Sequence, residues 1–491
     1  MTLPKSLSDF IASLDAERGV CVQGQRDASS TRATFPVTDP ATGAVLAEVA
    51  DGNADDARLA VDAAQAALGP WGALAPRERS EILRRSFELI LQSSDDLAAL
   101  MSAENGKSLA DSRAEVTYAA EFFRWFAEEA VRLDGDYVES PAGGTRTIVT
   151  SRPIGVAALA TPWNFPAAMA TRKIAPALAA GCTVVLKPAA ETPLTVLAIY
   201  DILQRAGVPE GVVNVVPTTD PDAVVGGWLA DERVRKISFT GSTRIGSLLL
   251  SQAADRIVSS AMELGGNAPF VVHRDADIEQ AVAGAMIAKF RNGGQACTAA
   301  NRFYVHADVR DAFADAFGRE LEALRVGHAF ADDNQIGPLI SHRAVEGVTR
   351  LVNDALDRGA RIAHQAATPE GTQGSFYPPT LLVDVPADAD VVLNEIFGPI
   401  APIVTYTDDE ALVSELNRTE LGLAAYIFSG DLGWALHLAE RTEAGMVGIN
   451  RGLVSDPAAP FGGVKQSGIG REGAREGIKE FREIQYFSVA W

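Results

Sequence analysis

From residue 156 onward, short apolar runs alternate along the chain with longer amphipathic stretches. The runs Val156–Thr161, Thr183–Lys187 and Lys236–Thr240 have the length of strands, and each precedes a stretch whose apolar residues recur at helical spacing. Apolar strands that alternate with helices are typical of a mostly parallel, doubly wound sheet. We therefore expect an α/β domain over this part of the chain.

The same alternation restarts at Glu263 and predicts a second α/β domain. Its expected strands are the runs 268–272, 302–307, 381–385, 402–406, 424–429 and 446–450. Stretches whose apolar residues recur at helical spacing separate the earlier of these runs, as in the first domain.

The chain before residue 156 is mainly helical in pattern. A helix is predicted from a cap at Asn53 to a stop at Gly69–Pro70, and two or three more helices follow from about Arg77 to Leu133. Thr145–Arg152 alternates like a strand between breaking residues, and predicts an excursion from the main domain. The tail 485–491 is also strand-like and lacks a core of its own, so we expect it to pair with this excursion or with a partner subunit.

These patterns give a domain hypothesis. Residues 1–133 and 152–262 form one α/β domain, residues 263–476 form the second, and residues 134–151 and 477–491 form a small β element. A chain of 491 residues is long enough for about three such units.

Composition narrows the possible partners. The net charge of −21 disfavours binding to nucleic acid or to an anionic membrane surface. The N-terminus carries acidic residues and no long apolar core, so it does not resemble a signal peptide, and no apolar run approaches the ~18 residues of a membrane span. The three cysteines are far apart and the six histidines lack paired metal-ligand spacing, which predicts neither a disulfide nor a metal site. A cytoplasmic setting fits best.

Cys297 is the leading candidate for chemistry. It ends the run FRNGGQAC, in which Asn292, Gly293 and Gly294 stop the preceding helix and place the thiol on a tight loop. Upstream, MELGGN places Glu263 before a glycine pair, where a ligand can approach the backbone closely. A thiol nucleophile and a carboxylate base suggest covalent catalysis. The alternative is that Cys297 is a buried small apolar residue, as free cysteines often are.

Three further motifs follow expected strands. Gly241 and Ser242 open a helix whose N-terminus is suited to a phosphate, although an ordinary turn explains them equally well. Lys187 ends a strand at the sheet edge that binds ligands in such folds, or is simply solvated. Asn164 is either an oxyanion donor or the cap of a helix from about Pro166, and its spacing alone favours the cap.

Together these segments resemble the aldehyde dehydrogenase family from about residue 35 to the C-terminus. The motifs that carry the resemblance occur in the family's order and spacing: PWNFP, LKPA, FTGS, ELGGN, GQAC, EIFGP and PFGGVKQSGIGREG. The resemblance implies two doubly wound open-sheet domains, a Rossmann-like cofactor domain and a catalytic domain, with a small β element for oligomerisation. It also implies a homodimer or homotetramer with the Thr145 segment and the C-terminal strand in the interface.

The resemblance assigns roles to residues of this chain. Cys297 matches the nucleophile, Glu263 the general base, and Asn164 the side-chain donor to the oxyanion, acting with the backbone N–H of Cys297. The implied reaction is attack of the Cys297 thiolate on an aldehyde, hydride loss to a nicotinamide, and hydrolysis of the thioester by water that Glu263 activates. The local field must then favour deprotonation of the thiol. The implied NADP- or NAD-binding positions are Trp163, Lys187, Pro188, Ala189, Ala190, Gly241, Ser242, Leu264, Glu395 and Phe397.

The resemblance also suggests the substrate. Arg172, Arg291 and Ser455 match positions that hold the far carboxylate in members acting on succinate semialdehyde. We therefore expect oxidation of succinate semialdehyde to succinate. Glutarate semialdehyde or another short aldehyde is the alternative, because one methylene changes binding by only ~1–3 kcal/mol. Two alternatives stay open: Arg172 is a solvated helix residue, and Arg291 interacts with the dipole at the C-terminus of its helix. An ester hydrolase that needs no cofactor and a non-catalytic protein on the same fold are the competing function classes.

Two positions depart from common family patterns. Ala299 stands where relatives often carry a second cysteine, which excludes a redox disulfide with Cys297. Ala190 stands where relatives that prefer NAD often carry a glutamate that repels a 2′-phosphate. NADP is therefore expected to bind, with Lys187 as a phosphate contact, although the neighbouring Glu191 opposes this.

Overall fold

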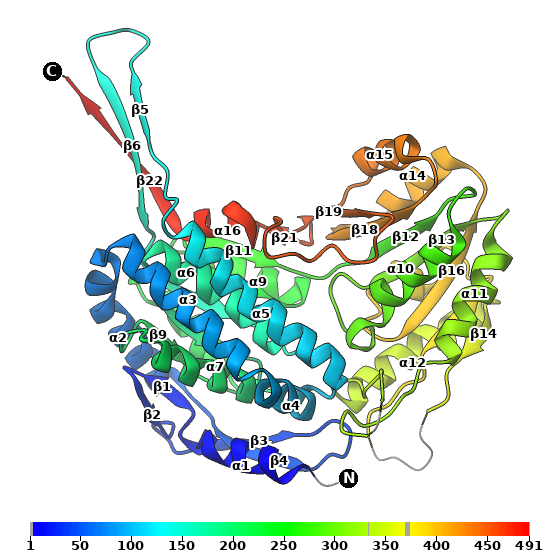
Figure 1. The fold of residues 1–491 in the computed structure, drawn as a ribbon, viewed down its shortest axis with the longest axis horizontal. Helices are drawn as coiled ribbons and strands as arrows, with labels where there is room; N and C mark the ends of the chain where they lie inside the picture. The colour runs from blue at the N-terminus through cyan, green and yellow to red at the C-terminus, as the bar shows by residue number, and fades with distance from the viewer. Residues whose placement is uncertain (1–2, 332, 369–373, 491) are drawn as a thin grey trace.

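The computed structural model describes residues 3–331, 333–368 and 374–490. Two sheets organise most of this chain, and a three-stranded arm projects away from them (Figure 1). Both sheets are built mainly of parallel strands, which confirms the predicted α/β class.

The first sheet has eight strands in the order β2-β1-β9-β8-β7-β10-β11-β21. The neighbours from β9 to β11 are parallel, whereas β1, β2 and β21 add antiparallel edges. The strands are β1 (Val20–Val22), β2 (Gln25–Asp27), β7 (Val156–Ala160), β8 (Thr183–Lys187), β9 (Val213–Val215), β10 (Val234–Thr240), β11 (Ser259–Glu263) and β21 (Gly468–Ile469).

Helices cover both faces of this sheet. Alternate residues of β7 face opposite cores: Ala157 and Leu159 pack in one apolar cluster, and Val156 and Ala158 pack in another. The first cluster is closed by α3 (Pro76–Gln92), α4 (Ser94–Asn105), α5 (Leu109–Glu129), α6 (Pro166–Ala180) and α7 (Pro193–Ala206). The second is closed by α2 (Ala54–Ala73), η2 (Asp222–Gly226), α8 (Gly227–Ala230) and α9 (Thr243–Ala254).

The predicted end of α2 at Gly69–Pro70 is wrong. The helix begins after the expected cap, Asn53, but continues through Pro70 to Ala73. Trp71 lies in this last turn and is only 1% exposed, so its burial holds the helix together past a residue that lacks a backbone donor.

The second sheet has seven strands in the order β14-β15-β16-β13-β12-β18-β19. All neighbours are parallel except the edge pair of β14 and β15. The strands are β12 (Ala268–Val272), β13 (Ala300–His306), β14 (Arg361–Gln365), β15 (Thr380–Val383), β16 (Ile400–Tyr406), β18 (Ala424–Phe428) and β19 (Met446–Ile449). The accompanying helices are α10 (Ile278–Phe290), η3 (Arg291–Gly294), α11 (Arg310–Glu322), α12 (His342–Asp357), α13 (Asp390–Leu393), α14 (Asp409–Asn417) and α15 (Leu432–Arg441).

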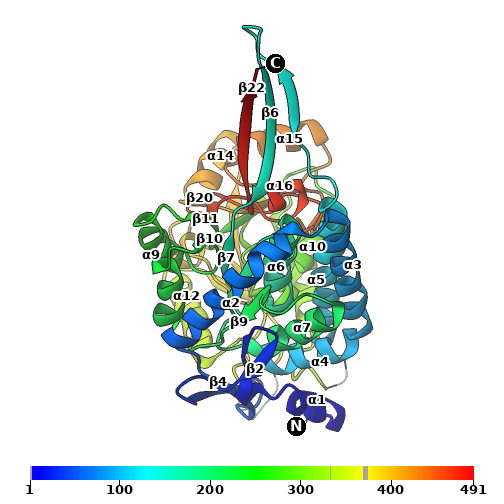
Figure 2. The ribbon, with the colours of Figure 1, turned by 90° about the vertical axis from the view of Figure 1, so that its left-hand side faces the viewer.

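The arm consists of β5 (Asp136–Glu139), β6 (Arg146–Pro153) and β22 (Arg482–Val489) in the order β22-β6-β5. The C-terminal strand pairs antiparallel with β6 over its whole length, which confirms the first of the two pairings expected for it. Both views show the arm standing clear of the two α/β lobes (Figures 1 and 2). Ile484 and Tyr486 of β22 are 80% and 67% exposed, so the arm presents apolar side chains to its surroundings.

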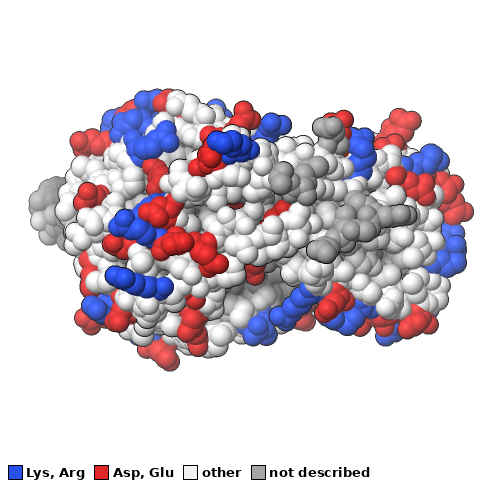
Figure 3. Space-filling model, turned by 90° about the horizontal axis from the view of Figure 1, so that it is seen from below, with Lys and Arg blue, Asp and Glu red and all other residues white. Residues whose placement is uncertain are grey.

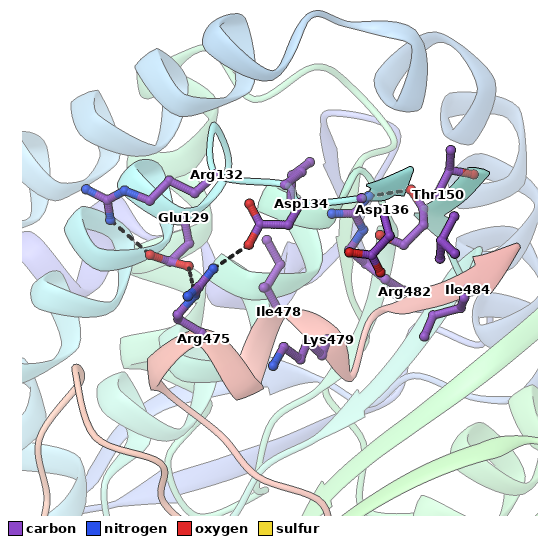
Figure 4. A pocket seen from close by; sticks show the side chains of 14 residues that line it. Glu129, Arg132, Asp134, Asp136, Thr150, Arg475, Ile478, Lys479, Arg482 and Ile484 are labelled. Carbon is purple, nitrogen blue, oxygen red and sulfur yellow. Dashed lines mark hydrogen bonds and ion pairs between the residues drawn. The ribbon is translucent and has the colours of Figure 1, made fainter. Parts of the chain in front are cut away.

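A cavity of about 280 Å³ lies at the base of the arm (Figure 4). Ion pairs of Arg475 with Glu129 and Asp134 cross it, and join α16 (Ala474–Lys479) to the end of α5 and the start of the arm. None of its lining residues belongs to the set expected to carry chemistry.

The remaining elements join the two lobes and extend the first one. The strand β21 lies within the range 263–476 that was expected to form the second domain, yet it pairs with β11 of the first sheet. The rest of the elements are α1 (Lys5–Ser13), η1 (Ala16–Arg18), β3 (Thr34–Thr38), β4 (Val45–Ala50), β17 (Leu421–Gly422) and β20 (Val464–Lys465).

The surface carries charges of both signs. On the face seen in Figure 3, Lys and Arg side chains lie among Asp and Glu side chains and form no continuous basic stripe over the described residues. None of the helices in the described ranges has the length and apolar character that crossing a membrane requires.

Candidate active site

Cys297 lies on a tight loop, as predicted. The helix α10 ends at Phe290, and Asn292, Gly293 and Gly294 all adopt positive φ angles, of 52°, 59° and 76°. A side chain at Gly294 would place its Cβ 2.3 Å from the carbonyl oxygen of Gly398, so only glycine fits there. The loop therefore brings the partly exposed Cys297 to the edge of the second lobe that faces the first.

Asn164 lies on the loop between β7 and α6, and it does not cap the helix. Phe165 holds the cap position of α6 and makes no side-chain capping bond. The Asn164 Nδ2 donates instead to the carbonyl of Gln295 at 3.1 Å, two residues before Cys297. This bond joins the two loops, and one Nδ2 hydrogen remains for an oxygen bound beside the thiol.

The backbone of Asn164 is fixed from two sides. Its carbonyl accepts hydrogen bonds from Lys107 Nζ at 2.6 Å and from Asn292 Nδ2 at 2.8 Å. Lys107 also pairs with Glu115, whose carboxylate accepts the backbone N–H groups of the first turn of α6 at 3.0 and 3.1 Å. The sequence singled out neither Lys107, which lies between α4 and α5, nor Glu115, which lies within α5.

Glu263 is the last residue of β11 and is 3% exposed. Neither carboxylate oxygen has a hydrogen-bond partner among the described residues. Burial, and then the charge of Glu472, raise the pKa of Glu263 well above its usual range, while Arg172 and Lys173 oppose this. A carboxyl group with a raised pKa and free oxygens is suited to accept a proton from water.

The glycine pair after Glu263 packs against the loop that carries Cys297. A Cβ on Gly266 would lie 2.2 Å from the carbonyl oxygen of Cys297, so the two motifs meet in space only because this residue has no side chain. The Cys297 and Glu263 side chains are close enough that the charge of Glu263 contributes to raising the pKa of the thiol.

The environment of the thiol corrects one expectation. The local field was expected to favour deprotonation, but burial and then Glu395 raise the pKa of Cys297 to about 12. Arg172 and Arg291 lower it, without reversing the effect of burial. The resting group is therefore a thiol, and a base must remove its proton before attack.

A cavity of about 240 Å³ connects the thiol to the first sheet. It lies where the parallel strands β7, β10 and β11 end, which is the edge that binds ligands in open α/β sheets. Six of the ten residues expected to bind the cofactor line it together with Asn164 and Cys297: Trp163, Gly241, Ser242, Leu264, Glu395 and Phe397. Lys187, Pro188, Ala189 and Ala190 are not among its lining residues, and lie at the end of β8 next to β7.

The lining residues have the chemistry that a dinucleotide requires. Ser242 caps α9, whose N-terminal backbone groups are suited to hold a phosphate. Trp163 and Phe397 meet edge to face at 5.5 Å and provide apolar walls. Glu395 accepts the backbone N–H of Gly266 at 3.1 Å and offers carboxylate oxygens to ribose hydroxyls. The residues present therefore fit a nicotinamide dinucleotide.

Lys187 is partly exposed and makes no ion pair among the described residues. Burial lowers the pKa of its ammonium group, and the charge of Glu191 opposes this. A lysine at this strand end that makes no ion pair with the described residues has the properties expected of a contact to ribose or phosphate.

The three residues expected to bind a substrate carboxylate differ in their contacts with the rest of the protein. Arg172 is 1% exposed, so it is not a solvated helix residue. Its Nε lies 3.1 Å from Glu472, its Nη2 donates to Tyr118 at 3.0 Å, and its guanidinium lies 4.0 Å from the centre of the Phe461 ring.

Arg291, by contrast, has no carboxylate or hydrogen-bond partner in the described parts of the chain, and its guanidinium lies 4.9 Å from the ring centre of Phe165. Ser455 lies in the loop after β19, close enough to Tyr118 to lower the pKa of that phenol. Both arginines are close enough to lower the pKa of Cys297, but neither they nor Ser455 line the cavity at the thiol.

Comparison with known proteins agrees with this geometry. The model of the aldehyde dehydrogenase family matches residues 26–487. A succinate-semialdehyde dehydrogenase of Paenarthrobacter nicotinovorans is 50% identical over 91% of this chain and 99% of its own length. A glutarate-semialdehyde dehydrogenase of Pseudomonas putida is 48% identical over 93% of this chain and 94% of its own length. The crystal structure of an NADP-dependent enzyme of E. coli superimposes with a TM-score of 0.95 at 46% identity, covering 98% of this chain and 99% of that one.

Proposed function

We propose that this chain, which belongs to the aldehyde dehydrogenase family, oxidises succinate semialdehyde to succinate with NADP as the hydride acceptor. The observation that carries the proposal is the meeting of Cys297, Asn164 and the cofactor-binding motifs around one cavity. The relatives named for succinate semialdehyde and for an NADP-dependent enzyme support the choice of substrate and cofactor.

The residues of this chain act in sequence in the proposed reaction. After Cys297 loses its proton, its Sγ attacks the aldehyde carbon, and the oxyanion that forms accepts hydrogen bonds from Asn164 Nδ2 and from the backbone N–H of Cys297. A bound nicotinamide supplies the acceptor for the hydride whose loss leaves a thioester on Cys297. Glu263 then takes a proton from water, which attacks the thioester and releases the carboxylic acid.

The carboxylate end of the substrate is the basis for specificity. Among the described residues the Arg291 guanidinium contacts the Phe165 ring but has no carboxylate or hydrogen-bond partner, so a substrate carboxylate would compensate the charge of a partly buried cation. Glutarate semialdehyde is the second candidate, because a relative at 48% identity is named for it and one methylene changes affinity little.

The assembly, the domains and the compartment are also part of the proposal. The exposed apolar residues of the arm support a homodimer or homotetramer in which β22 and β6 lie at the interface. We assign cofactor binding to 1–133 with 152–262, catalysis to 263–476, and assembly to 134–151 with 477–491. The dependence on a free thiol at Cys297 supports a reducing, cytoplasmic setting.

A panel of aldehydes with both cofactors tests the proposal. Succinate semialdehyde, glutarate semialdehyde and butanal are compared by absorbance of the reduced nicotinamide, with NADP and with NAD. The expected result is the highest kcat/KM for succinate semialdehyde with NADP, and loss of activity in Cys297→Ser but not in Cys21→Ser. Equal kcat/KM for butanal and both semialdehydes would contradict the substrate class, and full activity of Cys297→Ser would contradict the nucleophile.

A further inference from the structure

The nucleophile and the oxyanion donor of the proposed reaction belong to different lobes. Cys297 lies on the loop between η3 and β13 of the second lobe, and Asn164 lies on the loop between β7 and α6 of the first. Both residues line the same cavity. The position of the thiol relative to the Asn164 amide therefore depends on the contacts that join the two lobes at this point.

Asn292 makes two of these contacts from a single residue. It lies on the same loop as Cys297 and is only 1% exposed. Its backbone N–H donates to Asp111 Oδ2 of α5 at 2.9 Å, and its side-chain Nδ2 donates to the backbone carbonyl of Asn164 at 2.8 Å. The loop that carries the thiol is therefore joined through Asn292 to two separate segments of the first lobe.

The side-chain amide of Asn292 also bonds within its own loop. Its Nδ2 donates to the carbonyl of Gln295 at 3.2 Å, and Asn164 Nδ2 donates to the same carbonyl at 3.1 Å. Asn292, Asn164 and Gln295 thus form a closed ring of hydrogen bonds across the cleft. Both partners of Asn292 Nδ2 are carbonyl oxygens, which accept only, so the ring fixes the orientation of this amide.

The backbone of Asn292 shows what its side chain adds. Asn292 has φ 52° and ψ 37°, in the left-handed region, and it is followed by two glycines that also have positive φ angles. Glycine adopts this conformation at the least cost, and asparagine is one of the few residues with a side chain that tolerate it. Asn292 therefore provides an amide donor in a turn whose backbone glycine alone could form.

We propose that Asn292 is a positioning residue: it sets the place of the Asn164 amide relative to the Cys297 thiol, through the hydrogen bonds that its own amide donates to Asn164 and Gln295. Asn292 does not line the cavity, so it acts through these two neighbours. The inference rests on the proposed roles of Cys297 and Asn164. An oxyanion donor acts only from a defined position, and a displacement of about 1 Å can lower the rate by roughly a hundredfold.

The variant Asn292→Gly removes the amide and keeps a backbone that tolerates positive φ. We expect kcat to fall by roughly ten- to a hundredfold, equally for succinate semialdehyde and butanal, because the oxyanion forms on both aldehydes. KM for NADP should stay within about twofold, because the change does not touch the residues that line the cofactor cavity.

Asn450→Gly is the matched control for this variant. Asn450 also has a positive φ, of 51°, and its amide bonds to the backbone of Ser429 at 2.9 and 3.0 Å, away from the cavity. Its replacement should lower stability in denaturant unfolding without lowering kcat. A fall in kcat that only followed the loss of stability would appear in both variants, and would contradict a positioning role.

A double-mutant cycle with Asn164→Ala provides a second readout. If Asn292 acts through Asn164, then Asn292→Gly should lower kcat by less than about threefold once the Asn164 amide is absent. Losses that multiply fully in the double variant would overturn the inference. So would an unchanged kcat of Asn292→Gly beside an impaired Asn164→Ala, which leaves the proposed function intact. Full activity of Asn164→Ala would instead contradict the proposed role of Asn164, and the inference with it.

Asn292→Asp tests the same hydrogen bonds if the glycine variant does not fold. Aspartate has the shape of asparagine, but its ionised carboxylate presents only acceptors to the carbonyls of Asn164 and Gln295. We expect kcat to fall by at least roughly tenfold with both aldehydes. A folded Asn292→Asp enzyme with the kcat of the wild type would overturn the inference.

Discussion

Lys107 donates a hydrogen bond of 2.6 Å from its Nζ to the backbone carbonyl of Asn164, 57 positions further along the chain. The ammonium group is fully buried, and its charge is balanced by Glu115, which is equally buried. One ion pair thus holds the loop that carries the candidate oxyanion donor, and joins it to the first turn of α6. The stability of the fold and the geometry of the active site depend here on the same two charges.

Lys107→Met should therefore reduce both stability and turnover. Loss of one partner of a buried ion pair costs about 3–5 kcal/mol, because the other charge is left uncompensated. Misplacement of Asn164 should lower kcat by roughly ten- to a hundredfold. Denaturant unfolding and steady-state kinetics measure the two effects, with the exposed Lys5→Met as control. A stable variant with unchanged kcat would show that the pair does not position Asn164.

Arg291→Ala should affect only the binding of a carboxylated substrate, whereas Arg172→Ala should also affect stability. Arg291 has no carboxylate or hydrogen-bond partner among the described residues. Its loss should therefore raise KM for succinate semialdehyde by roughly 10- to 100-fold and leave KM for butanal nearly unchanged. Loss of Arg172 leaves Glu472 with one cation fewer in a buried cluster, so it should also lower the melting temperature and impair both substrates. Kinetics with both aldehydes and thermal unfolding separate the cases. Equal effects of Arg291→Ala on the two substrates would exclude it from the carboxylate site.

Glu472→Gln should shift the pH dependence of thioester hydrolysis. The charge of Glu472 helps to raise the pKa of Glu263, so its removal should lower that pKa. Glu263 is an active base only when ionised, and the rate therefore rises as pH passes upward through its pKa. The rising limb should move to lower pH in the variant, as followed by single-turnover acid release. Glu480→Gln, which removes a partner of Lys236 instead, should leave the limb in place.

Alkylation of Cys297 should keep accelerating at high pH. Burial and Glu395 raise the pKa of the thiol to about 12, so only a small thiolate fraction exists near neutrality in the cofactor-free protein. The rate with iodoacetamide, measured by mass spectrometry of the Cys297 peptide, should rise through pH 9 without a plateau. A plateau near pH 7 would instead indicate a thiolate already stabilised at rest.

Ala190→Glu should select against NADP. A carboxylate near the end of β8 adds repulsion toward a 2′-phosphate beside Lys187, while ribose hydroxyls can still donate hydrogen bonds to it. We expect kcat/KM with NADP to fall by roughly ten- to a hundredfold, with a smaller change for NAD. Parallel kinetics with both cofactors decide the matter, and Ala189→Glu serves as the neighbouring comparison. Unchanged selectivity would mean that Ala190 does not face the 2′ position.

The sequence by itself determined the features that depend on neighbours along the chain. Alternating apolar runs predicted both sheets, because a parallel strand buried on two faces must be apolar throughout. The stop at Asn292–Gly294 predicted the loop of Cys297, because left-handed backbone is a local property of these residues. The tail was predicted to pair with the Thr145 strand or with a partner subunit because it has no core of its own, and it pairs with that strand.

Tertiary structure alone decided the features that depend on distant partners. Trp71 carries α2 past Pro70 through burial in a core that no local pattern shows. Asn164 is a donor to the loop of Cys297, and not a helix cap, because Gln295 lies beside it. Tyr118 and Lys107 belong to no local motif, and only folding places Arg172 and Asn164 against them. Charge and hydrogen bonding act through space, so the pKa of Cys297 and the partners of its site could only be found once the chain was folded.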